Sequence, residues 1–128
     1  MFKQRFLYYT KIMIAEVLIC RNVPKRYTYE VPKNSDIKIG DHVEIPFGKS
    51  LAVGIIWDII EATPQTNCKP IGKKLEKKPS LRKSSLNFIE WLSDEYNLTP
   101  HKAYQTIIGK IKKRDLSKEK TPKETLLE

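Results

Sequence analysis

The sequence predicts an α+β domain in which a small curled antiparallel β-sheet, a partly closed barrel, is followed by two helices. Two observations support this fold class. Short β-branched or alternating apolar segments occupy the chain up to about residue 75, and a helical spacing of apolar residues replaces them after residue 83. Because short turns join the segments, antiparallel pairing and closure into a small barrel are favoured. At 128 residues the chain is long enough for one domain with a modest core.

Five segments have the composition of β-strands. Residues 12–20 are apolar and β-branched, as in a buried strand, and residues 27–31 alternate between apolar and polar side chains. Residues 43–47 also alternate, after a Gly-Asp turn signal, and residues 51–60 form a long apolar strand. Residues 70–75 predict one further short strand.

Two helices are predicted after these strands. The first has Ser84 or Ser85 as its N-cap, and the second has Thr99 as its N-cap and Pro100 in its first turn. Their apolar stripes are Leu86, Ile89, Leu92 and Tyr96 in the first helix, and Ala103, Ile107, Ile108 and Ile111 in the second. Residues 112–128 are almost all charged or polar and predict a disordered basic tail.

The basic residues are unevenly distributed. The chain has 24 Lys and Arg against 15 Asp and Glu, a net charge of +9, and seven of the basic residues but only one acidic residue lie between positions 69 and 85. Such a cluster is typical of a surface that binds the phosphate backbone of a nucleic acid, although lysine-rich segments can also serve only to solubilise a surface. The candidate backbone contacts are Lys49, Lys73, Lys74, Lys77 and Lys78.

Motifs for catalysis and for cofactor or metal binding are absent from the sequence. It contains no GxxxxGK[ST] phosphate loop and no GxSxG turn, so we expect no enzymatic activity, no catalytic residue and no cofactor. His42 and His101 are predicted to be surface residues, and Cys20 and Cys68 to be reduced thiols rather than metal ligands. No apolar run is long enough for a membrane span, and no signal-peptide cleavage pattern is present. The sequence predicts a cytoplasmic, non-catalytic binding module without membrane partners.

Five segments carry a more specific pattern than composition does. They are residues 23–32 (VPKRYTYEVP), 39–49 (IGDHVEIPFGK), 51–57 (LAVGIIW), 68–71 (CKPI) and 89–96 (IEWLSDEY). In this order and spacing they resemble the segments "PL…FDY.VP", "GDRVxVPFGxR", "xxGIVV", "LKPI" and "WxADYY" of the primosomal protein N′ (PriA) family of replication-restart helicases. The likeness runs from about residue 13 to residue 109.

The resemblance implies that the domain binds the 3′ end of the nascent strand at forked DNA. In the family this DNA-binding domain precedes the helicase domains and the zinc-binding cysteines, which have no counterpart here. We therefore expect an N-terminal extension at residues 1–12, the DNA-binding domain at residues 13–111, and the tail. The implied partners are single-stranded or forked DNA, with a helicase or other primosome proteins acting in trans.

The family's pocket for the terminal nucleotide falls on four positions of this sequence. Tyr27 stands where the family has a phenylalanine and would stack on the last base, and its alternative role is that of an ordinary core aromatic residue. Thr28 replaces an aspartate, so the strong charged acceptor for a sugar hydroxyl becomes a weaker neutral one. Gly48 would let the backbone approach the ligand, or serve only the turn. Lys69 would pair with a phosphate, or remain a solvated lysine.

Two other functions agree with the sequence. One is a protein-interaction module that docks on a helicase or replication protein. The other is a general binder of single-stranded nucleic acid without end specificity, because curled β-domains with basic loops also bind RNA. A binder of phosphate backbones is expected to lose affinity steeply with salt, whereas a docking module has little affinity for nucleic acid at any salt concentration.

Overall fold

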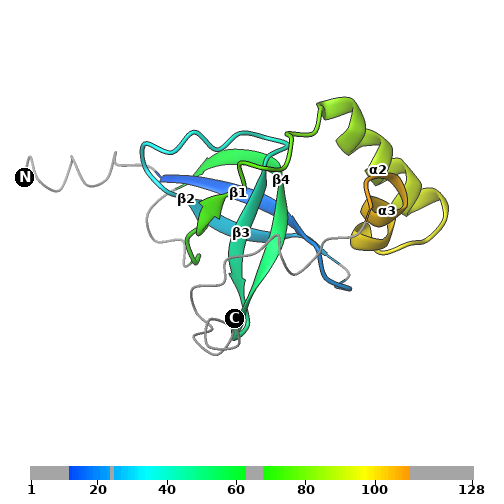
Figure 1. Cartoon of the computed structure of the whole chain (residues 1–128), viewed down its shortest axis with the longest axis horizontal. Helices are drawn as coiled ribbons and strands as arrows, with labels where there is room; N and C mark the ends of the chain where they lie inside the picture. Colours follow the sequence, from blue (N-terminus) through cyan, green and yellow to red (C-terminus); the bar gives the residue numbers. More distant parts are fainter. Residues whose placement is uncertain (1–11, 24, 63–67, 110–128) are drawn as a thin grey trace, which may run out of the picture.

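The computed structural model describes residues 12–23, 25–62 and 68–109. Five strands come first, β1 (Ile12–Ile19), β2 (Tyr27–Val31), β3 (His42–Phe47), β4 (Ser50–Ala62) and β5 (Lys73–Lys74), and the helices α2 (Lys83–Glu95) and α3 (Pro100–Ile107) follow. This order confirms the predicted α+β class (Figure 1). The predicted extension, apart from Ile12, and the predicted tail lie outside the described residues.

The five strands form one antiparallel sheet with the order β2-β1-β4-β3-β5. The sheet is curled but is not closed into a barrel. Among the described residues its edges are linked by one isolated parallel bridge, between Glu30 of β2 and Pro70. There the Glu30 N–H donates to the Lys69 carbonyl at 2.8 Å, and the Ile71 N–H donates to the Glu30 carbonyl at 2.9 Å. This bridge uses residues that were predicted to start the last strand, so β5 itself is only two residues long.

Both faces of the central strands are buried, which explains why residues 52–57 are continuously apolar. One face encloses the inner core, which contains Ala15, Val17, Ile19, Tyr29, Val43, Ile45, Ala52, Ile56 and Ile71. The other face contributes Leu18, Val53, Ile55 and Trp57 to a second core beneath the helices. At Gly54 a Cβ would overlap the Val17 side chain, so glycine allows β1 and β4 to approach closely here.

The two helices cover the second core at one end of the sheet (Figure 1). Leu86 and Ile89 of α2 and Ala103 and Tyr104 of α3 are the buried helical residues. The predicted start of α3 is confirmed, because the Thr99 Oγ1 accepts the Lys102 N–H at 3.2 Å. No helix in the described part of the chain is long and apolar enough to cross a membrane.

Two sequence predictions are wrong. The N-cap of α2 is Arg82, in extended conformation and without a side-chain capping bond, and not Ser84 or Ser85. His42 is buried rather than on the surface, with 2% of its area exposed. Its Nε2 lies 2.8 Å from the Tyr104 Oη, so a partner on α3 compensates the burial of this polar side chain.

Candidate nucleic-acid interface

Tyr27 and Phe47 form an aromatic pair at the rim of the inner core. Tyr27 begins β2 and Phe47 ends β3, and their half-buried rings meet edge to face with centroids 5.4 Å apart. The Lys25 Nζ lies 5.4 Å from the Tyr27 ring centroid, and the Arg21 guanidinium lies 5.9 Å from the Phe47 ring centroid. An aromatic ring with a cation nearby is suited to a stacked base and its neighbouring phosphate, and each of these two rings has such a cation.

Thr28 faces the opposite side of the sheet from Tyr27, because successive side chains of a strand alternate. Its side chain is exposed, and its Oγ1 lies 3.5 Å from the Cys68 Sγ. Lys69, whose side chain is exposed, follows directly after this cysteine and is tied to β2 by the bond from the Glu30 N–H. The side chains of Tyr27 and Thr28 therefore lie on opposite faces of the sheet at its β2 edge.

Gly48 lies in the tight turn that connects β3 to β4. Its φ of 65° is unfavourable for residues with a side chain, as at the first central position of a type II′ turn. A Cβ at this position would have no atom of the described residues within 4 Å, so these residues leave the space above Gly48 open. Arg21 anchors the far side of the turn, because its Nη2 donates to the Leu51 carbonyl at 2.7 Å and to the Ser50 Oγ at 3.3 Å. The hydrogen bonds from Arg21 thus hold the turn in place, and the described residues leave space next to Gly48.

The structure places the four predicted pocket residues in two groups. Tyr27 contacts Phe47, which precedes Gly48, and Thr28 contacts Cys68, which precedes Lys69. Phe47, Arg21 and Lys25 were not among the predicted site residues. Phe47 had a signal, since it belongs to the segment that resembles "VPFG", whereas the contacts of the two cations with the rings depend on the fold.

The lysines predicted to contact the DNA backbone have different environments. Lys49 in the β3–β4 turn, Lys73 and Lys77 are exposed, and Lys78 is half-buried. Lys74 is different, because its Nζ lies 3.4 Å from the buried Asp41 and 3.5 Å from Asp36. Its charge is therefore compensated within the fold, and it is the least suited of the five to a phosphate.

Burial is the main cause of the shifted pKa values of Cys20 and Tyr29. Burial raises the pKa of the Cys20 thiol to about 12, against a smaller opposite effect of Lys78. Burial, and to a lesser degree Tyr27, raises the pKa of Tyr29, whose hydroxyl donates to the Pro46 carbonyl at 2.7 Å. No group of three potential metal ligands occurs among the described residues.

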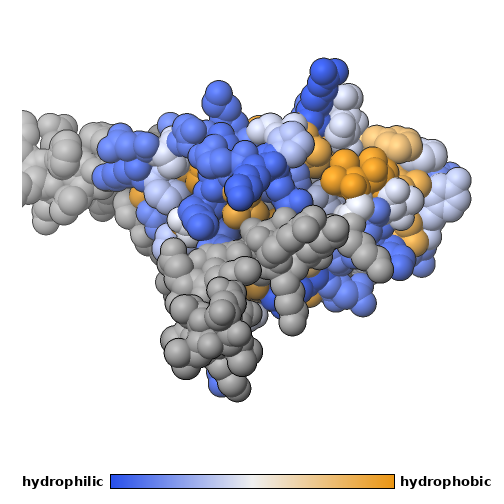
Figure 2. Space-filling view, in the orientation of Figure 1, coloured by the Kyte–Doolittle hydropathy of each residue, from blue (hydrophilic) through white to orange (hydrophobic). Residues whose placement is uncertain are grey.

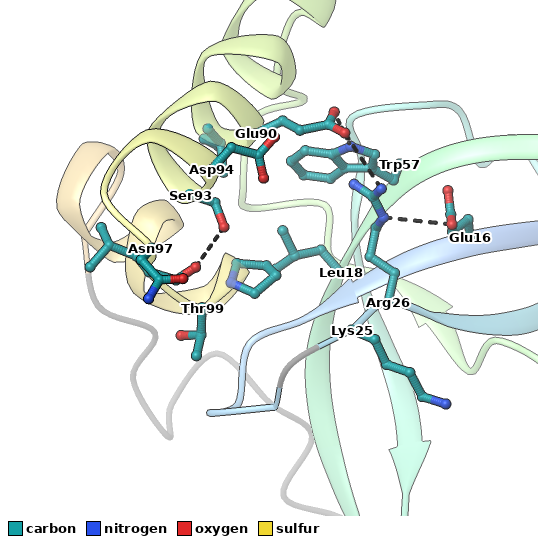
Figure 3. A pocket seen from close by; sticks show the side chains of 13 residues that line it. Glu16, Leu18, Lys25, Arg26, Trp57, Glu90, Ser93, Asp94, Asn97 and Thr99 are labelled. Carbon is teal, nitrogen blue, oxygen red and sulfur yellow. Dashed lines mark hydrogen bonds and ion pairs between the residues drawn. The ribbon is translucent and has the colours of Figure 1, made fainter.

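A cleft of about 690 Å³ separates the sheet from the helices, but its charges do not suit a phosphate (Figure 3). Arg26 lies in it between Glu16 and Glu90, 3.6 Å from each carboxylate, and its guanidinium is 5.4 Å from the Trp57 ring centroid. Asp94 adds a third carboxylate to the lining. Arg26 pairs with two of these acids, so Lys25 is the one other cation among the described residues that line the cleft.

Comparison with known proteins identifies the chain as a member of a DNA-binding family. Residues 16–109 match the model of a family described as "3′DNA-binding domain (3′BD)" of PriA. The chain is 28% identical over 68 residues to the replication restart protein PriA of Rickettsia conorii, and 29% identical over 68 residues to that of Rickettsia felis. Each match covers 53% of this chain and 10% of the relative. The chain therefore matches about a tenth of the length of these relatives.

Proposed function

We propose that this chain, which belongs to the family of PriA 3′ DNA-binding domains, is a non-catalytic module that holds the 3′ end of a nascent strand at forked DNA during replication restart. The observation that supports this most is the aromatic pair Tyr27–Phe47, which lies between Lys25 and Arg21 and beside the open space above Gly48. In this proposal the module works in the cytoplasm with a helicase or primosome proteins in trans, and it needs no cofactor.

The terminal nucleotide would lie along the outer edge of β2. Its base would stack on the Tyr27 ring, a contact worth about 1–3 kcal/mol in single-strand binders. Its 3′-hydroxyl would meet the Thr28 hydroxyl on the other side of the edge, and Lys69 would pair with a phosphate. The absent side chain at Gly48 leaves room for the sugar.

Fluorescence anisotropy with matched oligonucleotides tests this function. Wild type is expected to bind a strand with a free 3′-hydroxyl more tightly than the same strand with its 3′ end blocked. Tyr27→Ala should lose this preference and keep most of the salt dependence, whereas Tyr27→Phe should retain it. Tyr96→Ala is the matched control, because Tyr96 is an exposed tyrosine on the helical end of the domain. Equal affinity of wild type for free and blocked ends would contradict end recognition.

A second candidate function is protein docking, and one surface favours it. Phe88, Trp91 and Tyr96 at α2 are 50%, 49% and 62% exposed. Phe88 and Trp91 are stacked with centroids 5.7 Å apart, and Tyr96 meets Trp91 edge to face at 6.1 Å. Figure 2 shows that hydrophobic surface gathers at this helical end of the molecule. Three adjoining exposed aromatic residues are typical of an interaction surface.

The charges around this aromatic surface favour a basic protein segment over DNA. Glu90, Asp94 and Glu95 are exposed on the same helix. Asp94 and Glu95 lie in its last turn, where the helix dipole favours cations, and Lys83 lies in its first turn, where the dipole favours anions. This arrangement costs helix stability, and a cationic partner at the C-terminal end would relieve the cost.

Isothermal titration calorimetry tests the docking function. The partner is Rickettsia conorii PriA from which the segment that matches this chain, about a tenth of its length, has been removed. Wild type and Tyr27→Ala should bind this protein alike, and Trp91→Ala should bind it weakly. If Trp91→Ala instead weakens binding of single-stranded DNA, the aromatic surface belongs to the DNA interface.

A further inference from the structure

A cavity with a basic lining lies between the end of β1 and the start of α3. Its volume is about 550 Å³, and its polar lining includes Arg21, Asn22, Asn97, Thr99, His101 and Lys102. Among the described residues its lining contains no carboxylate, whereas three carboxylates line the cleft that contains Arg26. The cavity therefore combines cations with neutral hydrogen-bonding groups, the side chains that most often contact DNA phosphates and sugars.

Arg21 connects this cavity to the proposed site of the terminal nucleotide. It lines the cavity, and its guanidinium also reaches the β3–β4 turn and lies over the Phe47 ring. Phe47 in turn contacts the Tyr27 ring. A continuous surface thus runs from Tyr27 across Phe47 and Arg21 into the cavity, where Lys102 is exposed.

We propose that this cavity binds the sugar-phosphate backbone of the nucleotides that precede the 3′-terminal one, with Arg21, His101 and Lys102 as the phosphate contacts. The inference rests on the proposed function, because it takes Tyr27 as the place of the last base. The strand then leaves the edge of β2 toward α3. This direction keeps the phosphates away from Glu16, Glu90 and Asp94 in the acidic cleft.

The geometry around Arg21 supports a phosphate contact. Arg21 carries five N–H donors, and the contacts to Ser50 and Leu51 both use its Nη2, so its other nitrogens remain to face a phosphate. Burial, and to a lesser degree the nearby charges of Lys102 and Arg21, lower the pKa of His101. A phosphate placed among the three groups would offset their mutual repulsion.

Lys102→Gln is the cleanest test, because Lys102 is exposed and its side chain makes no hydrogen bond or ion pair with the described residues. The probes are oligothymidylates with a free 3′-hydroxyl, from a dinucleotide to a hexanucleotide. Wild type should bind longer probes progressively more tightly. Lys102→Gln should lose part of this gain and keep its affinity for the dinucleotide. Its plot of log affinity against log salt should be shallower by about 0.7, the value for one phosphate contact on a single strand.

Lys33→Gln is the matched control. Lys33 is an exposed lysine beyond the far end of β2, so its loss removes the same charge away from the cavity. Equal length dependence and equal salt slopes in the Lys102 and Lys33 variants would overturn the proposal. Arg21→Lys keeps the charge but loses the planar fork, and it should lose part of the length-dependent gain.

This test separates the two proposals. If wild type binds free and blocked 3′ ends equally but Lys102→Gln still loses the length-dependent gain, the cavity is a backbone site and end recognition is wrong. If wild type prefers the free end and Lys102→Gln behaves as Lys33→Gln does, the terminal site stands and the strand takes another path.

Discussion

His42 Nε2 and Tyr104 Oη lie 2.8 Å apart in the core beneath the helices, and the two side chains are only 2% and 0% exposed. This contact joins the first residue of β3 to the middle of α3. Because α3 also carries His101 and Lys102, the buried pair helps to fix the position of these two residues relative to Arg21, which follows β1. A polar contact in the core therefore supports the proposed path of the DNA backbone.

Tyr104→Phe should lower the free energy of unfolding by about 1–3 kcal/mol, because the buried His42 Nε2 loses this hydrogen-bond partner. Urea unfolding followed by circular dichroism measures the change. Tyr96→Phe removes the same hydroxyl from an exposed ring and should change stability by less than about 0.5 kcal/mol. Equal stability of the two variants would show that the buried contact contributes nothing.

The strand and helix positions were largely predictable because they depend on local patterns. The range Tyr27–Val31 agrees with the prediction, since an alternating segment ends at Pro32, which cannot donate a ladder hydrogen bond. The start of α3 was predictable because Thr99 and Pro100 act on the adjoining backbone. At α2 this reasoning failed, because two serines offered a cap that the helix does not use.

Contacts between distant residues were not predictable from one sequence. His42 alternates with apolar residues as an exposed strand residue would, and its partner Tyr104 lies 62 positions away. Lys74 belongs to a basic run, but Asp41, which also accepts from the Ser80 hydroxyl, neutralises it only in the folded chain. Arg21 likewise gives no sign in the sequence that it lies over the Phe47 ring.

The two cysteines should differ in reactivity, and DNA should protect one of them. Burial raises the pKa of Cys20 to about 12, so its thiol stays protonated and unreactive at neutral pH. Cys68 is half-buried beside Thr28 at the proposed terminal site. Iodoacetamide followed by mass spectrometry should therefore modify Cys68 before Cys20. An oligonucleotide with a free 3′-hydroxyl should slow this modification more than the same strand with a blocked end. Equal protection by both strands would place the terminal nucleotide elsewhere.

Protonation of His101 should couple DNA binding to pH. Burial first, and then Lys102 and Arg21, lower the pKa of His101, while the Cys20 thiol in the same cavity is neutral. The unfolded chain takes up this proton near the ordinary value of about 6.5, so His101 lowers stability as the pH falls from there through its folded pKa.

A bound phosphate should raise the pKa of His101 again, so that the complex takes up a proton. Affinity for a tetrathymidylate should then increase as the pH falls below about 6.5, and His101→Gln should remove this part of the increase. An NMR titration of the His101 ring with and without the oligonucleotide measures the shift directly. An unchanged pKa in the complex would contradict a phosphate in the cavity.

In the proposed terminal site, Thr28 would set how strongly the free 3′-hydroxyl is distinguished from a 3′-phosphate. As a neutral hydroxyl it should give wild type a preference for the free end of about 1 kcal/mol, the net contribution of one hydrogen bond. Thr28→Asp should increase this preference, because a carboxylate accepts the hydroxyl more strongly and repels the phosphate. Titration of each protein against the same oligonucleotide with the two ends measures the ratio of affinities.

Thr28→Asp should also lower the stability of the fold, and the experiment must separate this effect from the effect on binding. Thr28 lies directly opposite Glu16 in the pairing of β1 with β2, so a new carboxylate faces an existing one. Arg26, 3.6 Å from Glu16, screens only part of the repulsion, and Thr28→Asp should lose about 0.2–1 kcal/mol of stability. The Thr28→Asn variant carries a side chain of nearly the same shape as aspartate but without its charge. It should therefore keep both the stability and the modest preference of wild type for the free end. If all three proteins bind both ends equally, Thr28 has no part in recognising the end, and the edge of β2 contributes only a basic surface for DNA.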